Sequence, residues 1–210
     1  MSTRRILGVE LAVMALLAIV TVLFPECFAT FIARPELYLH AKFVHVLSVT
    51  LFYANVVIGT LWETRSLLSR NASHIRFTYQ TVAWLDAVFT APLILLSLLS
   101  GLMLGAVLGG IFSIGWLASA FALFVLSGLV WVTLDIPTQY KVKRLFAETP
   151  EESPTLPDEL LRVHRFRLRL NVFAIALLSV VFYLMVHKPE VPAIRGWLAP
   201  PHPNGVAPEP

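Results

Sequence analysis

A histidine and a lysine lie three residues apart near the start of an apolar segment, "HAKFVHVLSVTLFYANVVIGTLWE" (residues 40–63). On a helix Lys42 and His45 share one face, and His45 lies about 13 Å inside a membrane at about 1.5 Å per residue. A neutral imidazole in a dry helix bundle is a good axial ligand for haem iron, and Lys42 could pair with a haem propionate or with lipid phosphate. The alternative is structural, with His45 hydrogen-bonded to a serine or a backbone carbonyl of another helix.

Further residues continue the face of His45, because they return to nearly the same angle on a helical wheel. The predicted face consists of Lys42, His45, Val49, Phe52, Val56, Gly59 and Glu63. His40 lies about 140° away at about 100° per residue, so it cannot chelate a ligand together with His45.

A carboxylate lies within the next apolar segment, "TYQTVAWLDAVFTAPLILLSLLSGLMLG" (residues 78–105). Asp86 is a candidate catalytic residue, because an ionisable group at membrane depth is usually functional. A proton relay and an interhelical packing pair both fit, and Asn55 or Arg65 is the expected partner. Pro92 predicts a kink in the same helix.

Other polar residues are interpreted more simply. We expect Glu10 to pair with a cytoplasmic arginine, and Asp135 to be an interface residue beside Gln139 and Lys141. The single cysteine excludes an internal disulfide framework and a cysteine-based zinc site. The sequence contains no convincing Ser-His-Asp arrangement, phosphate loop or paired-carboxylate motif.

The elements that must position these residues are membrane helices. Of the 210 residues 57% are hydrophobic and 14% charged, more apolar surface than a soluble domain can bury. Apolar stretches long enough to span occur at residues 6–24, 37–62, 80–106, 113–135 and 168–187. The alternation of a β-barrel is not visible, so we expect an all-α membrane protein, a bundle of five transmembrane helices.

Lysine and arginine are distributed unequally between the two sides, 12 against 3. The positive-inside rule therefore predicts that the N-terminus lies in the cytoplasm and the C-terminus outside. We expect the location to be a bacterial inner membrane. The basic residues counted on the cytoplasmic side include Arg167. A helix that begins near Pro157 could run unbroken through Arg162, Arg165 and Arg169 into the last span, and topology control is sufficient to explain this basic stripe. The net charge of +3 is too small to indicate binding of nucleic acid.

The chain divides into three predicted parts. Residues 1–36 form an N-terminal transmembrane anchor with an outer loop, and we expect it to be retained rather than cleaved as a signal peptide. Residues 37–188 form a four-helix transmembrane bundle with a cytoplasmic loop at residues 136–167. Residues 189–210 form a proline-rich tail that we expect to be disordered.

Several motifs resemble the small bacterial membrane protoporphyrinogen oxidase family. "KFVH" (residues 42–45) is similar to the Lys-x-x-His start of the first helix of that family, and "FTAPLILLSLLSGL" is similar to its second helix. Lys188 and Pro189 match the end of its last helix, so the resemblance covers about residues 38–190. It implies a four-helix haem-b protein. The chain departs from the family at "WLASA", where Ala118 and Ala120 replace a histidine and a lysine.

The segments "HVLSVTLFYANVVIG" and "DAVFTAP" also resemble uncharacterised predicted integral membrane proteins related to that family. Together the resemblances imply a haem-b redox protein, with His45 as axial ligand to the iron and a redox partner or membrane complex. The second ligand could be Met185, His187 or Met103, or the iron could be five-coordinate. Lys42 is then a propionate partner. The alternative is a non-enzymatic accessory subunit or small transporter, whose polar core contains His45, Asn55 and Asp86.

Overall fold

The computed structural model describes residues 3–150, 153 and 155–192, and the regular secondary structure of these residues is entirely helical. The first helices are α1 (Thr3–Leu23), α2 (Pro25–Ile32), the 3₁₀ turn η1 (Pro35–Leu37) and α3 (Tyr38–Ser69). They are followed by α4 (Ala72–Leu85), the π turn η2 (Asp86–Thr90), α5 (Ala91–Val107), the 3₁₀ turn η3 (Ile111–Ser113) and α6 (Gly115–Val130). The chain continues with the π turn η4 (Trp131–Asp135), α7 (Ile136–Glu148) and α8 (Asp158–His187). The predicted tail lies outside the described residues from residue 193 onward.

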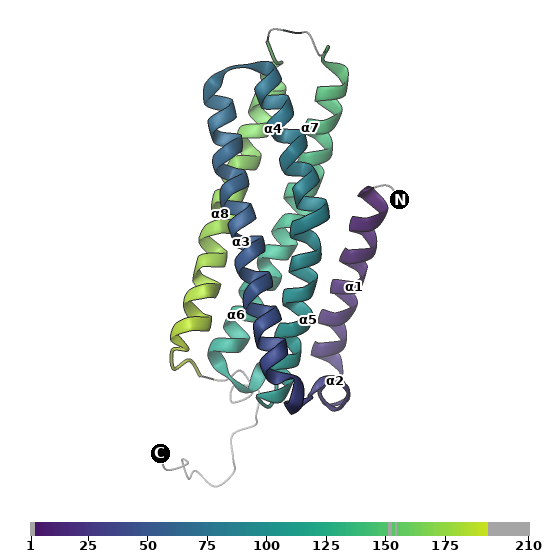
Figure 1. The fold of residues 1–210 in the computed structure, drawn as a ribbon, viewed down its shortest axis with the longest axis vertical. Helices are drawn as coiled ribbons and strands as arrows, with labels where there is room; N and C mark the ends of the chain where they lie inside the picture. Colours follow the sequence, from purple (N-terminus) through teal and green to yellow (C-terminus); the bar gives the residue numbers. More distant parts are fainter. Residues whose placement is uncertain (1–2, 151–152, 154, 193–210) are drawn as a thin grey trace, which may run out of the picture.

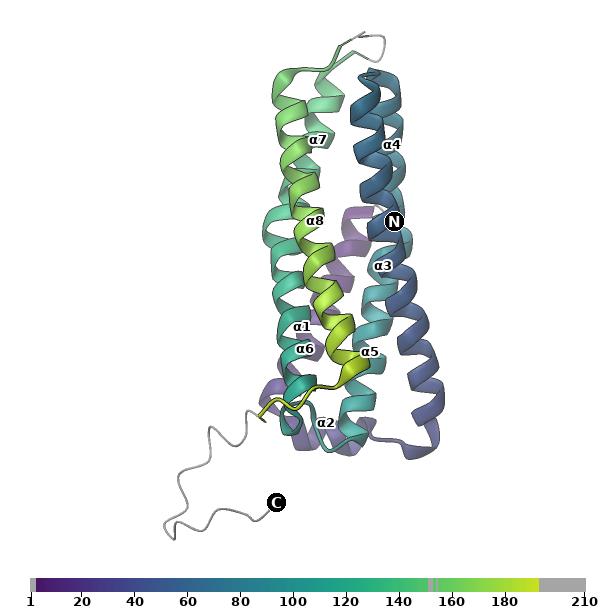
Figure 2. The same cartoon turned by 90° about the vertical axis from the view of Figure 1, so that its left-hand side faces the viewer.

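Four continuous helical stretches are long and apolar enough to cross a membrane. They are Pro35–Ser69, Ala72–Val107, Gly115–Glu148 and Asp158–His187. Each contains 30 to 36 residues, whereas about 20 are sufficient to cross the hydrocarbon. Figures 1 and 2 show these stretches running side by side along the long axis, each antiparallel to the next in the chain. The prediction of an all-α membrane protein is therefore confirmed.

Helix α1 lies outside this four-helix bundle and packs against α5 (Figure 1). Its apolar part, Gly8–Leu23, is shorter than the four long stretches. Figure 1 shows α1 beginning part-way along the bundle and ending beside α2. A fifth span and the orientation of the termini therefore stay predictions.

The two ends of the bundle are closed by different turns. One end, called the hairpin end below, contains the α3–α4 turn and the α7–α8 loop. There Arg70 has a φ of 53°, and the side chain of Asn71 caps α4 by accepting a hydrogen bond from the backbone N–H of His74 at 3.0 Å. At the opposite end, α5 is followed by Gly109 and Gly110, whose φ values of 92° and 107° are easily adopted only by glycine.

Residues 136–167, whose cytoplasmic location stays a prediction, are mostly helical, and the helix expected to begin near Pro157 and to continue into the last span is confirmed by α8. Helix α7 forms because it has an apolar side that it can bury, and α8 begins as early as Asp158. A core at the hairpin end joins α4, α7 and α8 through Ile75, Tyr79, Val142, Leu145, Phe146 and Leu160. A second core lies toward the opposite end and contains Leu98, Leu102, Ile111 and Leu117.

Large apolar side chains cover the outside of the long helices. Exposed examples are Leu39, Phe43, Leu61, Leu129 and Val186. A bundle that leaves so many such side chains uncovered needs lipid around it, because water would penalise each of them.

Candidate functional site

Arg167 of α8 lies inside the bundle with only 1% of its surface exposed. Its Nη1 donates to Glu63 Oε1 at 2.6 Å, its Nη2 to Asp86 Oδ2 at 3.2 Å and its Nε to Asp135 Oδ1 at 3.0 Å. The three carboxylates come from α3, η2 and η4. A planar guanidinium presents its donors in a fixed fork, which suits it to holding several carboxylates at once. These four residues, called the Arg167 cluster below, join all four long helical stretches.

Gln139 and Tyr79 complete the surroundings of the cluster. Gln139 Nε2 donates to Asp86 Oδ2 at 3.3 Å and to Asp135 Oδ2 at 3.2 Å. The guanidinium of Arg167 lies 5.5 Å from the centre of the Tyr79 ring, where a cation is attracted by the aromatic face. The Tyr79 hydroxyl donates to the backbone carbonyl of Gln139 at 2.6 Å. These contacts hold α4 and α7 against the cluster.

Each aspartate of the cluster belongs to a π turn. Asp86 is the first residue of η2 and Asp135 is the last residue of η4. Each turn is followed almost at once by a proline, Pro92 or Pro137. Proline has no N–H and its ring crowds the carbonyl four residues earlier, so a locally wider turn accommodates it. The disturbance predicted at Pro92 is therefore a π turn, and it recurs at Pro137.

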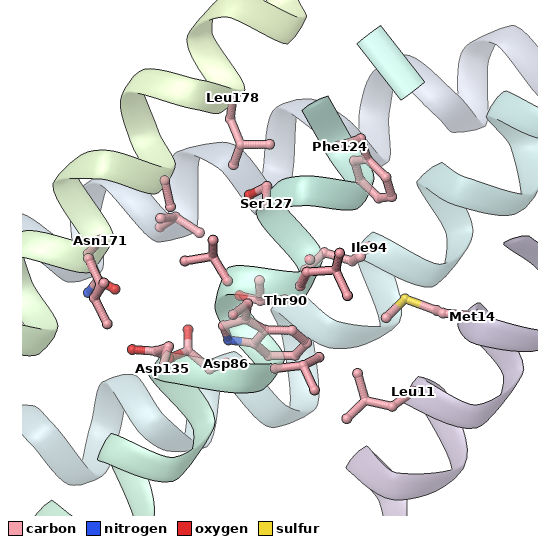
Figure 3. A pocket seen from close by; sticks show the side chains of 18 of the residues that line it. Leu11, Met14, Asp86, Thr90, Ile94, Phe124, Ser127, Asp135, Asn171 and Leu178 are labelled. Carbon is pink, nitrogen blue, oxygen red and sulfur yellow. The ribbon is translucent and has the colours of Figure 1, made fainter. Parts of the chain in front are cut away.

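A cavity of about 500 Å³ lies beside the cluster, between α3, α5, α6 and α8. Figure 3 shows Asp86 and Asp135 at one end of it, with Asn171 nearby, and Leu11 and Met14 of α1 on another side. The remaining walls are largely apolar. Apolar walls with a few convergent polar groups are typical of a binding site for a small molecule.

Two buried side chains, one in the cluster and one beside it, have polar atoms without a hydrogen-bond partner among the described residues. Glu63 Oε2 is one such atom, although Glu63 is 0% exposed. The other two atoms are the ring nitrogens of His164, a residue that is also 0% exposed. His164 lies one turn before Arg167 and packs edge-on against Tyr79, with 6.0 Å between the ring centres. Buried polar atoms without a partner are rare and call for a functional explanation.

His45 lies toward the opposite end of the bundle, away from the Arg167 cluster. Its Nδ1 contacts the backbone carbonyl of Ser97 at 2.8 Å, and a Cβ added to Gly101 would lie 2.9 Å from its Cε1. Because a carbonyl only accepts, Nδ1 carries the hydrogen and the other nitrogen of a neutral ring is unprotonated. This is the structural alternative that the sequence left open. His45 also lines a second cavity of about 240 Å³, together with Met185.

The structure brings only part of the predicted haem site together. Met185 lines the same cavity as His45, as a second ligand would. Lys42 is exposed and does not line that cavity, and His187 is exposed, bonded to the carbonyl of Tyr183 at 3.2 Å. Asp86 belongs to the Arg167 cluster, which also contains Glu63, 18 residues after His45 on α3 and so about 27 Å further along the axis.

Haem does not fit the second cavity in this conformation. Its volume of about 240 Å³ is below the range of about 300–1,000 Å³ that accommodates drug-sized ligands, and haem is larger than most of these. The donor set of His45 and Met185 suits a haem iron, but the walls would have to move apart. Within the described residues, no three His, Cys, Asp or Glu side chains are grouped to hold a metal ion.

The expected partners of Asp86 were wrong. Asn55 donates instead to Thr90 Oγ1 at 2.7 Å, and Arg65 is exposed. The partners of Asp86 are Arg167 and Gln139. Arg167 was counted only among the basic residues that set the topology, whereas its guanidinium faces the bundle core rather than lipid headgroups.

Asp135 has a partner that the sequence did not predict, whereas the expected pairing of Glu10 with an arginine stays a prediction. Asp135 contacts Gln139 as predicted, but its second partner is Arg167. Lys141 pairs with Glu159 at 2.7 Å rather than with Asp135. Glu10 Oε2 is buried and has no hydrogen-bond partner among the described residues, so the structure gives this atom no arginine.

Comparison with known proteins places the chain in a family. No curated protein and no solved structure matches it. The comparisons also give no link to the protoporphyrinogen oxidase family, so that kinship and haem binding stay predictions. The model of the family described as Predicted integral membrane protein (DUF2269) matches residues 39–189. This range contains all four long helical stretches, apart from residues 35–38 at the start of the first. The chain therefore belongs to this family of predicted integral membrane proteins, as the resemblance of its second and third apolar segments indicated.

Proposed function

We propose that this protein is a membrane carrier that binds small, lipid-soluble organic cations in the cavity beside the Arg167 cluster. The charge balance of the cluster supports this proposal, because three carboxylates face one guanidinium. With all four groups ionised the formal charge is −3 + 1 = −2. An uncompensated charge is costly in a low dielectric, so the cluster attracts a cation or protons.

Asp86 is the carboxylate best placed to meet a ligand. Its side chain is 18% exposed and lines the cavity, compared with 7% for Asp135 and 0% for Glu63. Within the described residues Asp86 Oδ1 has no hydrogen-bond partner, because Arg167 and Gln139 both contact Oδ2. A positively charged group at this end of the cavity would therefore find a free carboxylate oxygen.

The remainder of the cavity favours an apolar ligand. Its volume of about 500 Å³ lies within the range of about 300–1,000 Å³ usual for small-molecule sites. Helix α1 supplies one wall from outside the four-helix bundle, through residues that include Leu11 and Met14 (Figure 3). The cavity thus reaches the side of the bundle that faces lipid, which supports entry of the ligand from the bilayer.

The depth of the cluster supports a role on one side of the membrane. Asp86 precedes Val107, the last residue of α5, by 21 residues, or about 32 Å at 1.5 Å per residue. The hydrocarbon is about 30 Å thick, so the cluster lies at its boundary when the opposite end of the bundle lies at the other boundary. The positive-inside rule favours a cytoplasmic hairpin end in a bacterial inner membrane, and thus an accessible cluster on the cytoplasmic side.

Binding of tetraphenylphosphonium, a permanently charged apolar cation, tests the proposal. We expect saturable binding to the purified protein in detergent at pH 8, measured by equilibrium dialysis. Asp86→Asn removes one carboxylate and keeps the shape of the side chain. A lost charge-assisted contact of about 1.5–3 kcal/mol corresponds to an affinity about 10–150-fold lower.

The matched control is Glu159→Gln, which neutralises an exposed carboxylate at the hairpin end. This variant should bind the probe with unchanged affinity. Absence of saturable binding to the unaltered protein would contradict the proposed function, and so would equal affinities of the unaltered protein and the Asp86→Asn variant.

A second candidate is a haem-b redox protein of protoporphyrinogen-oxidase-like type, with His45 as the axial ligand. The contact between Nδ1 and the Ser97 carbonyl favours it, because such a bond commonly orients a ligating histidine through its other nitrogen. The test is a reduced-minus-oxidised spectrum of protein purified from cells supplied with haem precursor. A haem band that disappears in His45→Ala would support this candidate, and a featureless spectrum would reject it.

A further inference from the structure

We infer that Asp86 holds an exchangeable proton in the ligand-free protein and releases it when an organic cation binds. The inference rests on the proposed function and adds a second ion to it. In the exchange the Asp86 carboxyl group loses one proton to bulk water and becomes a carboxylate beside the bound cation. The total charge of the cluster and its ligand is thereby unchanged.

The groups around Asp86 leave a deficit of positive charge. Its own π turn lies against α3 and α4, while α7 and α8 supply direct contacts through Gln139 and Arg167. The titratable or charged groups that these elements bring to the cluster are Glu63, Tyr79, Asp135, His164 and Arg167. Helix α1 also packs against η2 and carries Glu10, which does not line the cavity. Within the described chain, the ion pairs of these three cluster carboxylates are all with Arg167.

The Glu63 side chain gives independent evidence that the cluster lacks positive charge. Glu63 Oε1 receives the Nη1 hydrogen of Arg167, but Oε2 is fully buried and has no partner in the described structure. A fully ionised carboxylate would leave negative charge on that uncompensated oxygen. Protons shared within the cluster remove this penalty, since neutral carboxyl groups cost far less to bury than carboxylates do.

Asp86 is the member of the cluster from which a proton can leave. It is more exposed than Glu63 and Asp135, and it lines the cavity in which the cation would bind. A proton and a cation that neutralise the same carboxylate oppose one another, and this coupling is reciprocal. Cation binding must release the proton, and a high proton concentration must weaken cation binding.

The pH dependence has a definite sign and slope. Where Asp86 is protonated in the free protein, each fall of one pH unit should raise the apparent Kd for the cation about tenfold, for one proton released. At higher pH, where Asp86 is already ionised, the apparent Kd should become constant. Tetraphenylphosphonium is a suitable probe because it cannot gain or lose a proton itself.

The experiment measures tetraphenylphosphonium binding to the purified full-length chain from pH 5 to pH 9, together with proton release into weakly buffered solution. For the unaltered protein we expect a pH-dependent affinity and close to one proton released for each cation bound. The Asp86→Asn variant should show a low, pH-independent affinity equal to the acid limit of the unaltered protein. Glu159→Gln, the control at the exposed Lys141 pair, should follow the unaltered protein.

The outcomes separate the two proposals. Binding that is independent of pH and releases no protons would overturn the proton exchange and leave the proposed cation site intact. The proton exchange would also be overturned if Asp86→Asn kept the full pH slope, or if affinity depended on added sodium or potassium instead of pH. Absence of any binding would overturn the cation site itself.

Discussion

The Arg167 cluster and His45 both place polar groups among the helices of the bundle, but they are held in different ways. The Arg167 cluster joins charged side chains from four helical stretches, and two of its members, Arg167 and Glu63, are almost completely buried. His45 instead makes one close contact to a backbone carbonyl of a single neighbouring helix, beside a glycine that leaves room for its ring. The first arrangement depends on every helix, whereas the second depends on α3 and α5 alone.

This difference indicates what each place can do. A charged cluster with excess acid can exchange ions, and its contacts to all four stretches make it sensitive to their relative positions. A neutral histidine bonded to one carbonyl packs two helices and can offer its second nitrogen to a ligand. We therefore expect removal of the central guanidinium to affect the whole bundle and changes at His45 to have a smaller, pairwise effect.

The largest effect is expected for Arg167→Met. The substitution leaves three carboxyl groups without their cation, and two of these, on Glu63 and Asp135, are buried. Breaking a buried ion pair by removing one partner typically costs about 3–5 kcal/mol. Thermal unfolding in detergent, followed by circular dichroism, should show a strongly lowered midpoint. Arg165→Met is the matched control, because Arg165 is exposed on the same helix. Equal midpoints for the two variants would contradict a central role for the cluster.

The arginine that forms the cluster could have been identified from sequence spacing. On α8 a series of residues that are buried or line a cavity repeats at alternating intervals of four and three: Leu160, His164, Arg167, Asn171, Ala174, Leu178 and Val181. Leu170, Phe182, Met185 and Val186 also line the cavities, beside or after this series. Such a repeat predicts the seam of a helix bundle. Arg162, Arg165 and Arg169 fall outside it, so the spacing separates Arg167 from the arginines at the surface.

The face predicted for α3 was correct along much of its length. Phe52, Gly59 and Glu63 are buried, whereas Lys42 at its start is exposed. The helical wheel succeeded here because α3 is continuous. It gave the orientation of Glu63 but not its partner, since the partner depends on how far along the axis α8 lies beside α3.

The carboxylates of η2 and η4 were harder to place from sequence. A π turn contains an extra residue, so the faces of the residues before and after it no longer follow one 3.6-residue period. Counting through Pro92 or Pro137 therefore assigns side chains to the wrong face. The sequence does predict a disturbance at each proline, but the choice of a π turn over a kink depends on packing against the neighbouring helices.

A second prediction concerns the contact between His45 and α5. Gly101→Ala would place a Cβ about 2.9 Å from the imidazole, and overpacking of this kind typically costs about 1–3 kcal/mol. In the His45→Ala background the ring is absent, so the same substitution should cost much less. The thermal midpoints of the two single variants and the double variant form a cycle that measures this coupling. Additive effects would show that His45 does not occupy the space in front of Gly101.

The smallest effect is expected for Lys141→Ala, which breaks an ion pair at the hairpin end. Lys141 Nζ lies 2.7 Å from Glu159 Oε1, a distance close to the 2.6 Å between Arg167 Nη1 and Glu63 Oε1. The side chains of Lys141 and Glu159, however, are 40% and 47% exposed. Exposed pairs contribute little to stability, because water already solvates both charges, and salt screens the attraction further. The unfolding midpoint of Lys141→Ala should therefore lie near that of the unaltered protein, with a difference that shrinks between low and high salt. A loss as large as that of Arg167→Met would mean that this pair is shielded from water by lipid or by another chain, and that the hairpin end lies deeper in the membrane than its charges indicate.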